Sequence, residues 1–133
     1  MASTKVIQPS GWARPKGYSN GIIAEGKLLF IAGQVGWDPT KEDAKPKGDF
    51  AVQFDVALAN VVRVLREAGG LPEHLARVTI YVTDKKAYSA AVKEVGQAWR
   101  KHVGPTYPAM SLVQVADLLE EGALVEIEAT ATL

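Results

Sequence analysis

The order of the predicted elements indicates an α+β fold, in which two helices cover one face of a mixed β-sheet. The observations behind this prediction are two stretches of helical periodicity, residues 49–68 and 83–102, set among segments whose apolar residues alternate or cluster as in strands. Two helices cannot cover both faces of a sheet of this size. The opposite face is therefore left for solvent or for partner subunits.

The first strands are predicted within residues 21–32. Two short apolar runs, residues 21–24 and 28–32, are separated by Glu25, Gly26 and Lys27. A short polar turn containing glycine between two such runs predicts a β-hairpin. Residues 5–7 offer a possible additional edge strand.

The first helix is predicted from an apolar stripe at three- and four-residue spacing, formed by Phe54, Leu58, Val61 and Leu65. Asp49 is the expected N-cap, and the glycines and proline within residues 69–72 end the pattern. A second helix is expected to follow Thr83 or Asp84 and to end before Gly104 and Pro105. Its shared side carries Tyr88, Ala91, Val95, Ala98, Trp99 and His102.

Strands of period two complete the sheet. Val78, Ile80 and Val82 alternate with Thr79 and Tyr81, and residues 110–115 form a further predicted strand. In the last strand, residues 124–131, apolar and polar residues alternate and are expected on opposite faces. The apolar set is Val125, Ile127, Ala129 and Ala131, and the polar set is Glu126, Glu128 and Thr130.

Composition narrows the class of protein. The 133 residues correspond to a single domain, 1–133, and 15 basic residues balance 15 acidic ones. This neutral balance argues against a nucleic-acid partner. The absence of cysteine is consistent with a reducing compartment, and no apolar run is long enough to span a bilayer. No targeting signal is recognisable in residues 1–11. We therefore expect a cytoplasmic protein without a membrane partner.

Five stretches, in order along the chain, resemble the Rid/YjgF family of reactive-intermediate (enamine/imine) deaminases, to which RidA belongs. They are GYSNGI, LLFIAGQVGWDP, VLREAGGL, VTIYVTD, and PTYPAMSLVQVADL followed by VEIEATA. The resemblance implies a chorismate-mutase-like (YjgF) fold and a homotrimer whose sheets form a central barrel with clefts between subunits. It also implies a cofactor-free hydrolase that converts enamines and imines to ketoacids and ammonia.

The same resemblance assigns candidate site residues. Tyr18 matches the family's cleft tyrosine, and Glu126 matches the glutamate that positions the hydrolytic water, so both are expected to be catalytic. The matching stretches also give the expected substrate-binding residues, which are Gly33, Gln34, Trp37, Ala109 and Met110. Simpler interpretations stay open: Glu126 and Glu128 as solvated carboxylates, Tyr18 as a packing aromatic, and Trp37 as a loop anchor.

Met110 departs from the family pattern, because the deaminases carry an arginine at this position. A guanidinium can clamp a substrate carboxylate with two parallel hydrogen bonds, whereas a thioether offers no donor. We therefore expect a larger or less polar metabolite than the usual 2-aminoacrylate-type substrates. Candidates for a replacement cation, each equally readable as a surface charge, are Arg14, Lys16, Arg100, Lys101 and His102.

Two function classes follow. One is a hydrolase of an enamine, imine or related C–N bond, and the other is a non-catalytic trimer that binds a small molecule or a partner protein. Endoribonuclease activity is disfavoured by the neutral charge and by the lack of a catalytic histidine pair. His74 and His102 lack carboxylates at metal-ligand spacing, and the glycines form no phosphate-binding motif, so we expect neither a metal nor a cofactor.

Overall fold

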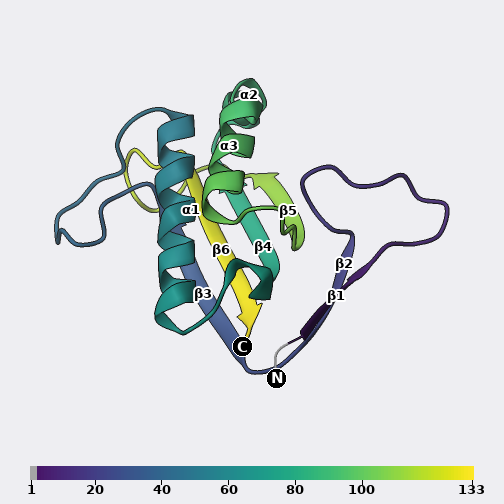
Figure 1. Ribbon diagram of the computed structural model, residues 1–133. Helices are drawn as coiled ribbons and strands as arrows, with labels where there is room; N and C mark the ends of the chain where they lie inside the picture. Colours follow the sequence, from purple (N-terminus) through teal and green to yellow (C-terminus); the bar gives the residue numbers. More distant parts are fainter. Residues whose placement is uncertain (1–2) are drawn as a thin grey trace.

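The computed structural model describes residues 3–133 and shows a mixed four-stranded sheet with helices on one face (Figure 1). Met1 and Ala2 lie outside the described residues, and with them the start of the segment in which no targeting signal is expected. The strand order is β3 (Leu28–Val35), β6 (Val125–Thr132), β4 (Leu75–Val82) and β5 (Ala109–Gln114). The β4–β5 pair is parallel and the other two pairs are antiparallel, so the predicted mixed sheet is confirmed.

The helices begin where the sequence predicts. In α1 (Phe50–Glu67) the Asp49 carboxylate accepts a hydrogen bond from the Val52 N–H at 3.0 Å, and before α2 (Lys85–Ala90) Asp84 caps Lys86 in the same way at 2.9 Å. The second predicted helix is not continuous, however. Ala91 leaves the helical conformation, with its N–H bonded to the carbonyl only three residues back, and α3 (Val92–His102) starts anew.

The predicted hairpin between the first two apolar runs is wrong. Strand β2 (Gly21–Glu25) pairs antiparallel with β1 (Ser3–Ile7), whereas β3 pairs with β6. Lys27 exchanges backbone hydrogen bonds of 2.9 and 2.8 Å with Leu133, so the chain enters the β6 pairing directly after Gly26. The turn signal is local, but the partner of each strand is set by longer-range pairing. In Figure 1, β1 and β2 lie beyond the β5 side of the sheet, opposite to β3.

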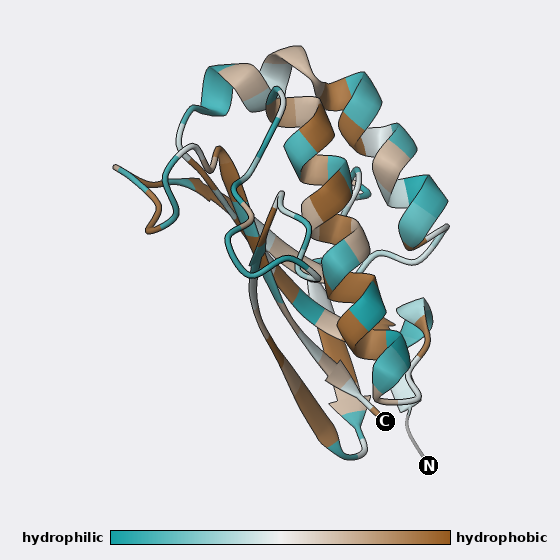
Figure 2. Ribbon diagram, turned by 90° about the vertical axis from the view of Figure 1, so that its left-hand side faces the viewer, coloured by the Kyte–Doolittle hydropathy of each residue, from teal (hydrophilic) through white to brown (hydrophobic). Residues whose placement is uncertain are grey.

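The core lies between the sheet and the helices. Fully buried apolar side chains come from α1, from β4 and from β6, and they include Phe54, Leu58, Leu65, Leu75, Val78 and Ile127. Figure 2 shows hydrophobic and hydrophilic segments alternating along the helices, as expected for helices buried on one side. A short 3-10 helix, Pro72–His74, leads into β4. Within residues 3–133, no helix combines the length and apolar character needed to cross a membrane.

On the open face of the sheet lie the residues that alternate with the buried ones along the strands. The predicted alternation in the last strand is confirmed, because Val125, Ile127 and Ala129 are buried while Glu126 and Glu128 are partly exposed. Large apolar residues also reach this face: Leu28 is 61%, Phe30 73% and Val113 42% exposed. Exposed apolar area of this kind commonly marks a surface that a partner covers.

Candidate functional site

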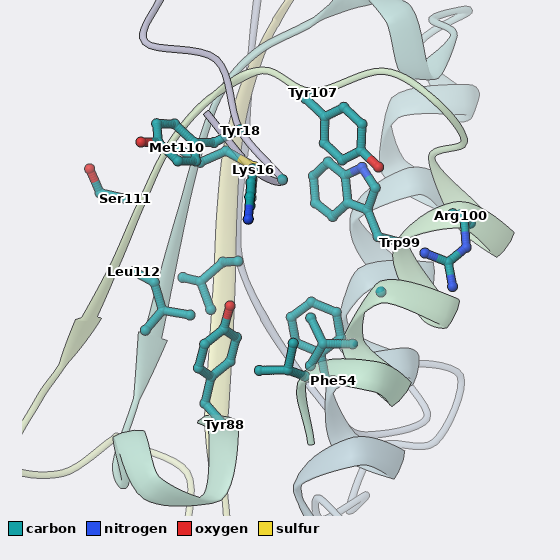
Figure 3. Close-up of a pocket in the computed structure, with 15 residues that line it drawn as sticks. Lys16, Tyr18, Phe54, Tyr88, Trp99, Arg100, Tyr107, Met110, Ser111 and Leu112 are labelled. Carbon is teal, nitrogen blue, oxygen red and sulfur yellow. The ribbon is translucent and has the colours of Figure 1, made fainter. Parts of the chain in front are cut away.

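A cavity of about 580 Å³ opens between β5 and α3, on the helix side of the sheet (Figure 3). This volume is typical of small-molecule sites, which span about 300–1,000 Å³. The wall is mainly apolar and aromatic, with two basic side chains. Its principal side chains are Lys16, Tyr18, Phe54, Tyr88, Trp99, Arg100, Tyr107, Met110 and Leu112.

Tyr18 and Met110 meet in this wall although 92 positions in the sequence separate them. The contact is fixed by Ser19, whose N–H donates to the Pro108 carbonyl at 2.9 Å and whose hydroxyl donates to the Tyr107 carbonyl at 2.5 Å. Ser19 is only 8% exposed, so both bonds are shielded from water. Tyr18 itself is 41% exposed, and its side chain is accessible to a ligand in the cavity.

Aromatic rings build the wall that faces Met110. The rings of Trp99 and Tyr107 are nearly parallel, at 8° with centroids 6.1 Å apart, and the Trp99 indole N–H donates to the Thr106 carbonyl at 2.9 Å. The sequence placed Tyr88 and Trp99 on the buried side of a helix but did not single out Tyr107. Its position three residues before Met110, in the same PTYPAM stretch, was the available signal.

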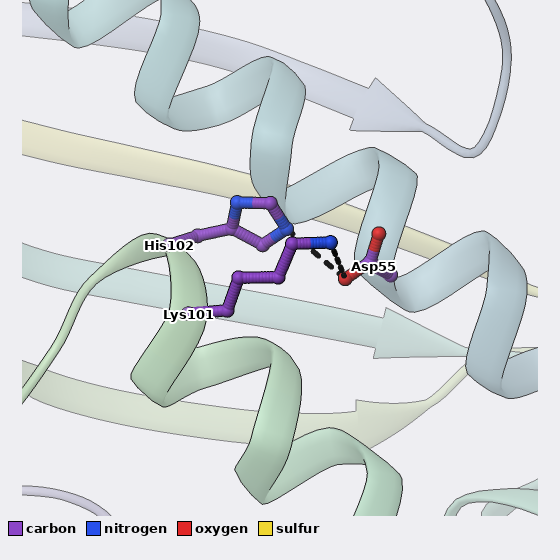
Figure 4. Close-up of polar contacts among 3 residues, drawn as sticks. All are labelled: Asp55, Lys101 and His102. Atoms are coloured by element: carbon purple, nitrogen blue, oxygen red, sulfur yellow. Dashed lines mark hydrogen bonds and ion pairs between the residues drawn. The ribbon is translucent and has the colours of Figure 1, made fainter.

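The candidate cations separate into three groups. Lys16 and Arg100 line the cavity, whereas Arg14 lines a neighbouring hollow of about 490 Å³ that also contains Glu73. Lys101 and His102 both contact the Asp55 carboxylate between α3 and α1, at 3.6 and 3.0 Å (Figure 4). Neither of these two lines the cavity. The structure therefore leaves Lys16 and Arg100 as the cations at this site.

Glu126 lies elsewhere. It sits in register with Tyr81, on the open face, whereas Met110 is in register with Val78, a core residue on the helix face. The Glu126 side chain covers Gly33 so closely that a Cβ built on Gly33 would lie 2.7 Å from Glu126 Cδ. Within one chain, the two expected catalytic residues, Tyr18 and Glu126, are thus on opposite faces of the sheet.

Two further polar groups accompany Glu126 on the open face. The Tyr81 hydroxyl donates a hydrogen bond to the Glu128 carboxylate. This bond raises the pKa of Tyr81 above its usual value, with smaller contributions from burial and from the charges of Glu128 and Glu126. At neutral pH Tyr81 is therefore a phenol, and its hydroxyl group holds the Glu128 side chain beside Glu126.

The remaining predicted binding residues do not reach the cavity. Trp37 lines a separate hollow of about 490 Å³ beside α1, where the Asn60 amide donates to the Trp37 carbonyl at 3.1 Å and anchors the loop. Gln34 donates to the carbonyl of Ala32 at 3.1 Å, beside Gly33. Ala109 precedes Met110 but does not itself line the cavity, its role being a backbone bridge with Ser19.

Among residues 3–133, no group of three histidine, cysteine or acidic side chains is arranged so that it could hold a metal ion. The polar side chains that line the cavity are the hydroxyl groups of Tyr18, Tyr88, Tyr107 and Ser111 and the basic groups of Lys16 and Arg100. These groups can recognise a ligand by hydrogen bonding and by charge.

Comparison with known proteins identifies the family. The family model described as Endoribonuclease L-PSP matches residues 12–133. The chain belongs to this family, the Rid/YjgF family. A RutC family protein of Synechocystis is 35% identical over 129 residues, which cover 97% of this chain and 96% of the relative. A goat protein named 2-iminobutanoate/2-iminopropanoate deaminase is 30% identical and covers 86% of this chain and 78% of its own length.

Solved structures agree with this assignment. A Rid family protein of unknown function from Yersinia pestis superposes with a TM-score of 0.85 at 33% identity, covering 98% of both chains. The Escherichia coli protein TdcF, solved with bound serine, gives a TM-score of 0.71 at 28% identity and covers 97% of this chain and 98% of TdcF. The predicted YjgF-type α+β fold is therefore confirmed. Met110 lines the cavity, and the family resemblance predicts that this methionine stands where the deaminases carry an arginine.

Proposed function

We propose that this Rid-family chain is a cofactor-free hydrolase of an enamine or imine, acting on a metabolite larger and less polar than 2-aminoacrylate. The observation that carries the proposal is the position of Met110, beside Tyr18 in the wall of a large aromatic-lined cavity. Thioether and aromatic groups favour an apolar ligand body over a small carboxylate. The names of the goat and cattle relatives, both 2-iminobutanoate/2-iminopropanoate deaminases, support the reaction class.

The proposed reaction is the addition of water to a C=N bond. An enamine first takes a proton at carbon to give the imine. Glu126 accepts a proton from water as the water oxygen attacks the imine carbon, and this proton passes to the imine nitrogen, which gives a carbinolamine. Glu126 then carries the hydroxyl proton of the carbinolamine to the nitrogen as the C–N bond breaks, so that ammonia leaves and the carbonyl forms. Tyr18 orients the substrate through its hydroxyl group.

This chemistry requires Glu126 and Tyr18 at one ligand, and the proposal supplies them from different subunits of a homotrimer with clefts between its subunits. The support is the exposure of Leu28 and Phe30 on the same face as Glu126, since a partner subunit would cover this apolar area. Light scattering tests the assembly. We expect a mass near three times 14.3 kDa, and a monomer would contradict the proposal.

The second candidate is a trimer that binds a small metabolite or a partner protein without turnover. It is favoured by the separation of Tyr18 and Glu126 onto opposite faces of the sheet within a single chain. In either case we propose a cytoplasmic protein with neither a nucleic-acid nor a membrane partner. The neutral net charge is the support for excluding nucleic acid.

Turnover of imines generated in situ separates the two candidates. Purified protein is mixed with 2-aminoacrylate and, separately, with imines of amino acids that carry larger apolar side chains, and ketoacid formation is followed. If the protein is a hydrolase, it should accelerate ketoacid formation from the larger imines and have little effect on 2-aminoacrylate. The Glu126→Gln variant should lose this activity. No acceleration with any imine would refute the hydrolase and leave the binding trimer.

Replacement of Met110 tests the specificity. Met110→Arg restores a fork of donors and should shift activity toward 2-aminoacrylate. Met110→Leu is the matched control, because it keeps an apolar side chain of similar volume and should keep the preference for larger imines. If Met110→Arg left the preference unchanged, the residue at position 110 would not set the specificity.

A further inference from the structure

We infer that Lys16 binds the anionic group of the ligand, and that the ligand is an aromatic 2-imino acid whose ring lies against the Trp99–Tyr107 wall. This inference rests on the proposed function for the imine, but the binding geometry it names can be tested without turnover. This inference places carboxylate recognition on the loop before Tyr18 instead of on β5.

Lys16 is singled out by where the basic side chains lie. Its side chain is drawn between Met110 and Trp99 in Figure 3, while Arg100 is drawn beyond Trp99, farther from Met110. The Arg100 guanidinium also folds back along its own helix, with Nη1 3.2 Å from where a Cβ of Gly96 would be. The Lys101 ammonium forms an ion pair with the Asp55 carboxylate, with 3.6 Å between Nζ and Oδ1. Of the two basic side chains that line the cavity, Lys16 is thus the one drawn beside Met110, the residue that stands where the resemblance implies an arginine.

Among residues 3–133, no acidic side chain lines this cavity beside Lys16. The side chains that line it are apolar, aromatic or basic, apart from the hydroxyl of Ser111. In the neighbouring hollow, by contrast, Arg14 shares the wall with Glu73. A carboxylate entering the cavity therefore meets two basic side chains, and no acidic side chain from the described residues of the same subunit, which favours an anionic ligand.

The aromatic wall defines the other end of the ligand. Trp99 is 5% exposed and its ring is fixed by the hydrogen bond to Thr106 and by stacking on Tyr107. A rigid ring pair facing a thioether provides two apolar surfaces for a planar group. A ligand with both an anionic head and an aromatic ring uses both parts of the wall. An ammonium is a point charge and holds one carboxylate oxygen, so the ring must supply the orientation that a guanidinium fork would give.

Binding of the stable ketoacid product tests this arrangement. Calorimetric titration of the intact protein compares phenylpyruvate with pyruvate, which lacks the ring, and with 4-phenylbutan-2-one, which lacks the carboxylate. We expect phenylpyruvate to bind at least about tenfold more tightly than either of the other two compounds. Its affinity should fall as the salt concentration is raised. Equal affinity for pyruvate and phenylpyruvate would overturn the aromatic assignment.

Charge-removing variants test the role of Lys16. Lys16→Met should weaken phenylpyruvate binding about tenfold and leave 4-phenylbutan-2-one unchanged, because a charge-assisted hydrogen bond is lost. Lys101→Met removes an equal charge that is held by Asp55 and should change neither affinity. Unchanged phenylpyruvate binding in Lys16→Met, or a loss that appears in Arg14→Met instead, would overturn the inference.

Turnover data distinguish this inference from the proposed function. If phenylpyruvate binds in a Lys16-dependent way while no imine is hydrolysed, the inference stands as a binding site and the hydrolase fails. If imines are hydrolysed at equal rates by the wild type and Lys16→Met, with no preference for an aromatic side chain, the hydrolase stands and the inference fails.

Discussion

The contact between Gly33 and Glu126 gives a direct test of whether the position of the carboxylate matters. In Gly33→Ala the new Cβ would lie 2.7 Å from Glu126 Cδ and 2.9 Å from Cγ, whereas ordinary van der Waals contact begins at 3.4 Å. The Cβ would overlap Glu126 Oε2 even more than Cδ, so the carboxyl group must retreat by more than about 0.7 Å. Gly33 does not have a positive φ, so its backbone accepts alanine.

This displacement should reduce activity much more than stability. Misplacing a reacting group by about 1 Å can cost on the order of 100-fold in rate, so we expect kcat to fall about 10- to 100-fold. The Glu126 side chain is flexible and lies on a partly exposed face, so it can move away as a whole, and the free energy of unfolding should fall by about 1 kcal/mol or less. The assays are initial rates of ketoacid formation with the preferred imine, and urea unfolding.

Gly21→Ala is the matched control. Gly21 also lies in a strand, and its added Cβ would make ordinary contacts with Ile7, at 3.4 Å from Cβ and 3.9 Å from the carbonyl oxygen. Its activity and stability should match those of the wild type. Full activity in Gly33→Ala, with activity lost in Glu126→Gln, would refute the reasoning, since the carboxylate would then tolerate the shift. Additive losses in the double variant would refute it too, because both changes are assigned to one group.

Three further predictions concern stability. Phe54→Ala empties a site that is fully buried in the core, and urea unfolding should show a loss of about 3–5 kcal/mol, with a loss under about 1 kcal/mol contradicting the packing. The raised pKa of Tyr81 means that its stabilising contribution is fully present below about pH 10 and is lost as pH rises through the folded-state pKa. The advantage of the wild type over Tyr81→Phe, measured by urea unfolding from pH 8 to 11, should therefore shrink above pH 10, and a constant advantage would contradict this. Asp49→Ala removes the hydrogen bond to the Val52 N–H and should cost about 1 kcal/mol in the same assay, whereas Asp49→Asn should keep most of it, and equal losses would exclude capping.

The sequence by itself determined the features that depend on near neighbours along the chain. Asp49 and Asp84 cap helices because the groups they bond lie two or three residues away. Gly69 and Gly104 follow helix ends with φ of 85° and 89°, a conformation that glycine adopts without steric cost. The alternation of apolar and polar residues also assigned the faces of β6 correctly, because side chains in any strand alternate.

The family resemblance predicted the fold and two of the residues that line the cavity. Tyr18 and Met110 were named from motifs 92 positions apart, and the structure brings them together through Ser19. Trp37, named in the same way, lies in a different hollow. Motifs report which residues recur in a family, but not which of them share a cavity within one chain.

Only the tertiary structure decided the long-range arrangements. The partner of β2 is β1 and not β3, because a turn signal does not say which strand edge is free. Five basic residues were equivalent candidates in sequence, and packing separated them: Asp55 holds Lys101 and His102, while Lys16 faces the cavity. Sheet register likewise set Glu126 on the face opposite to Met110. Each of these outcomes depends on contacts between segments far apart in the chain, whose energies no local pattern encodes.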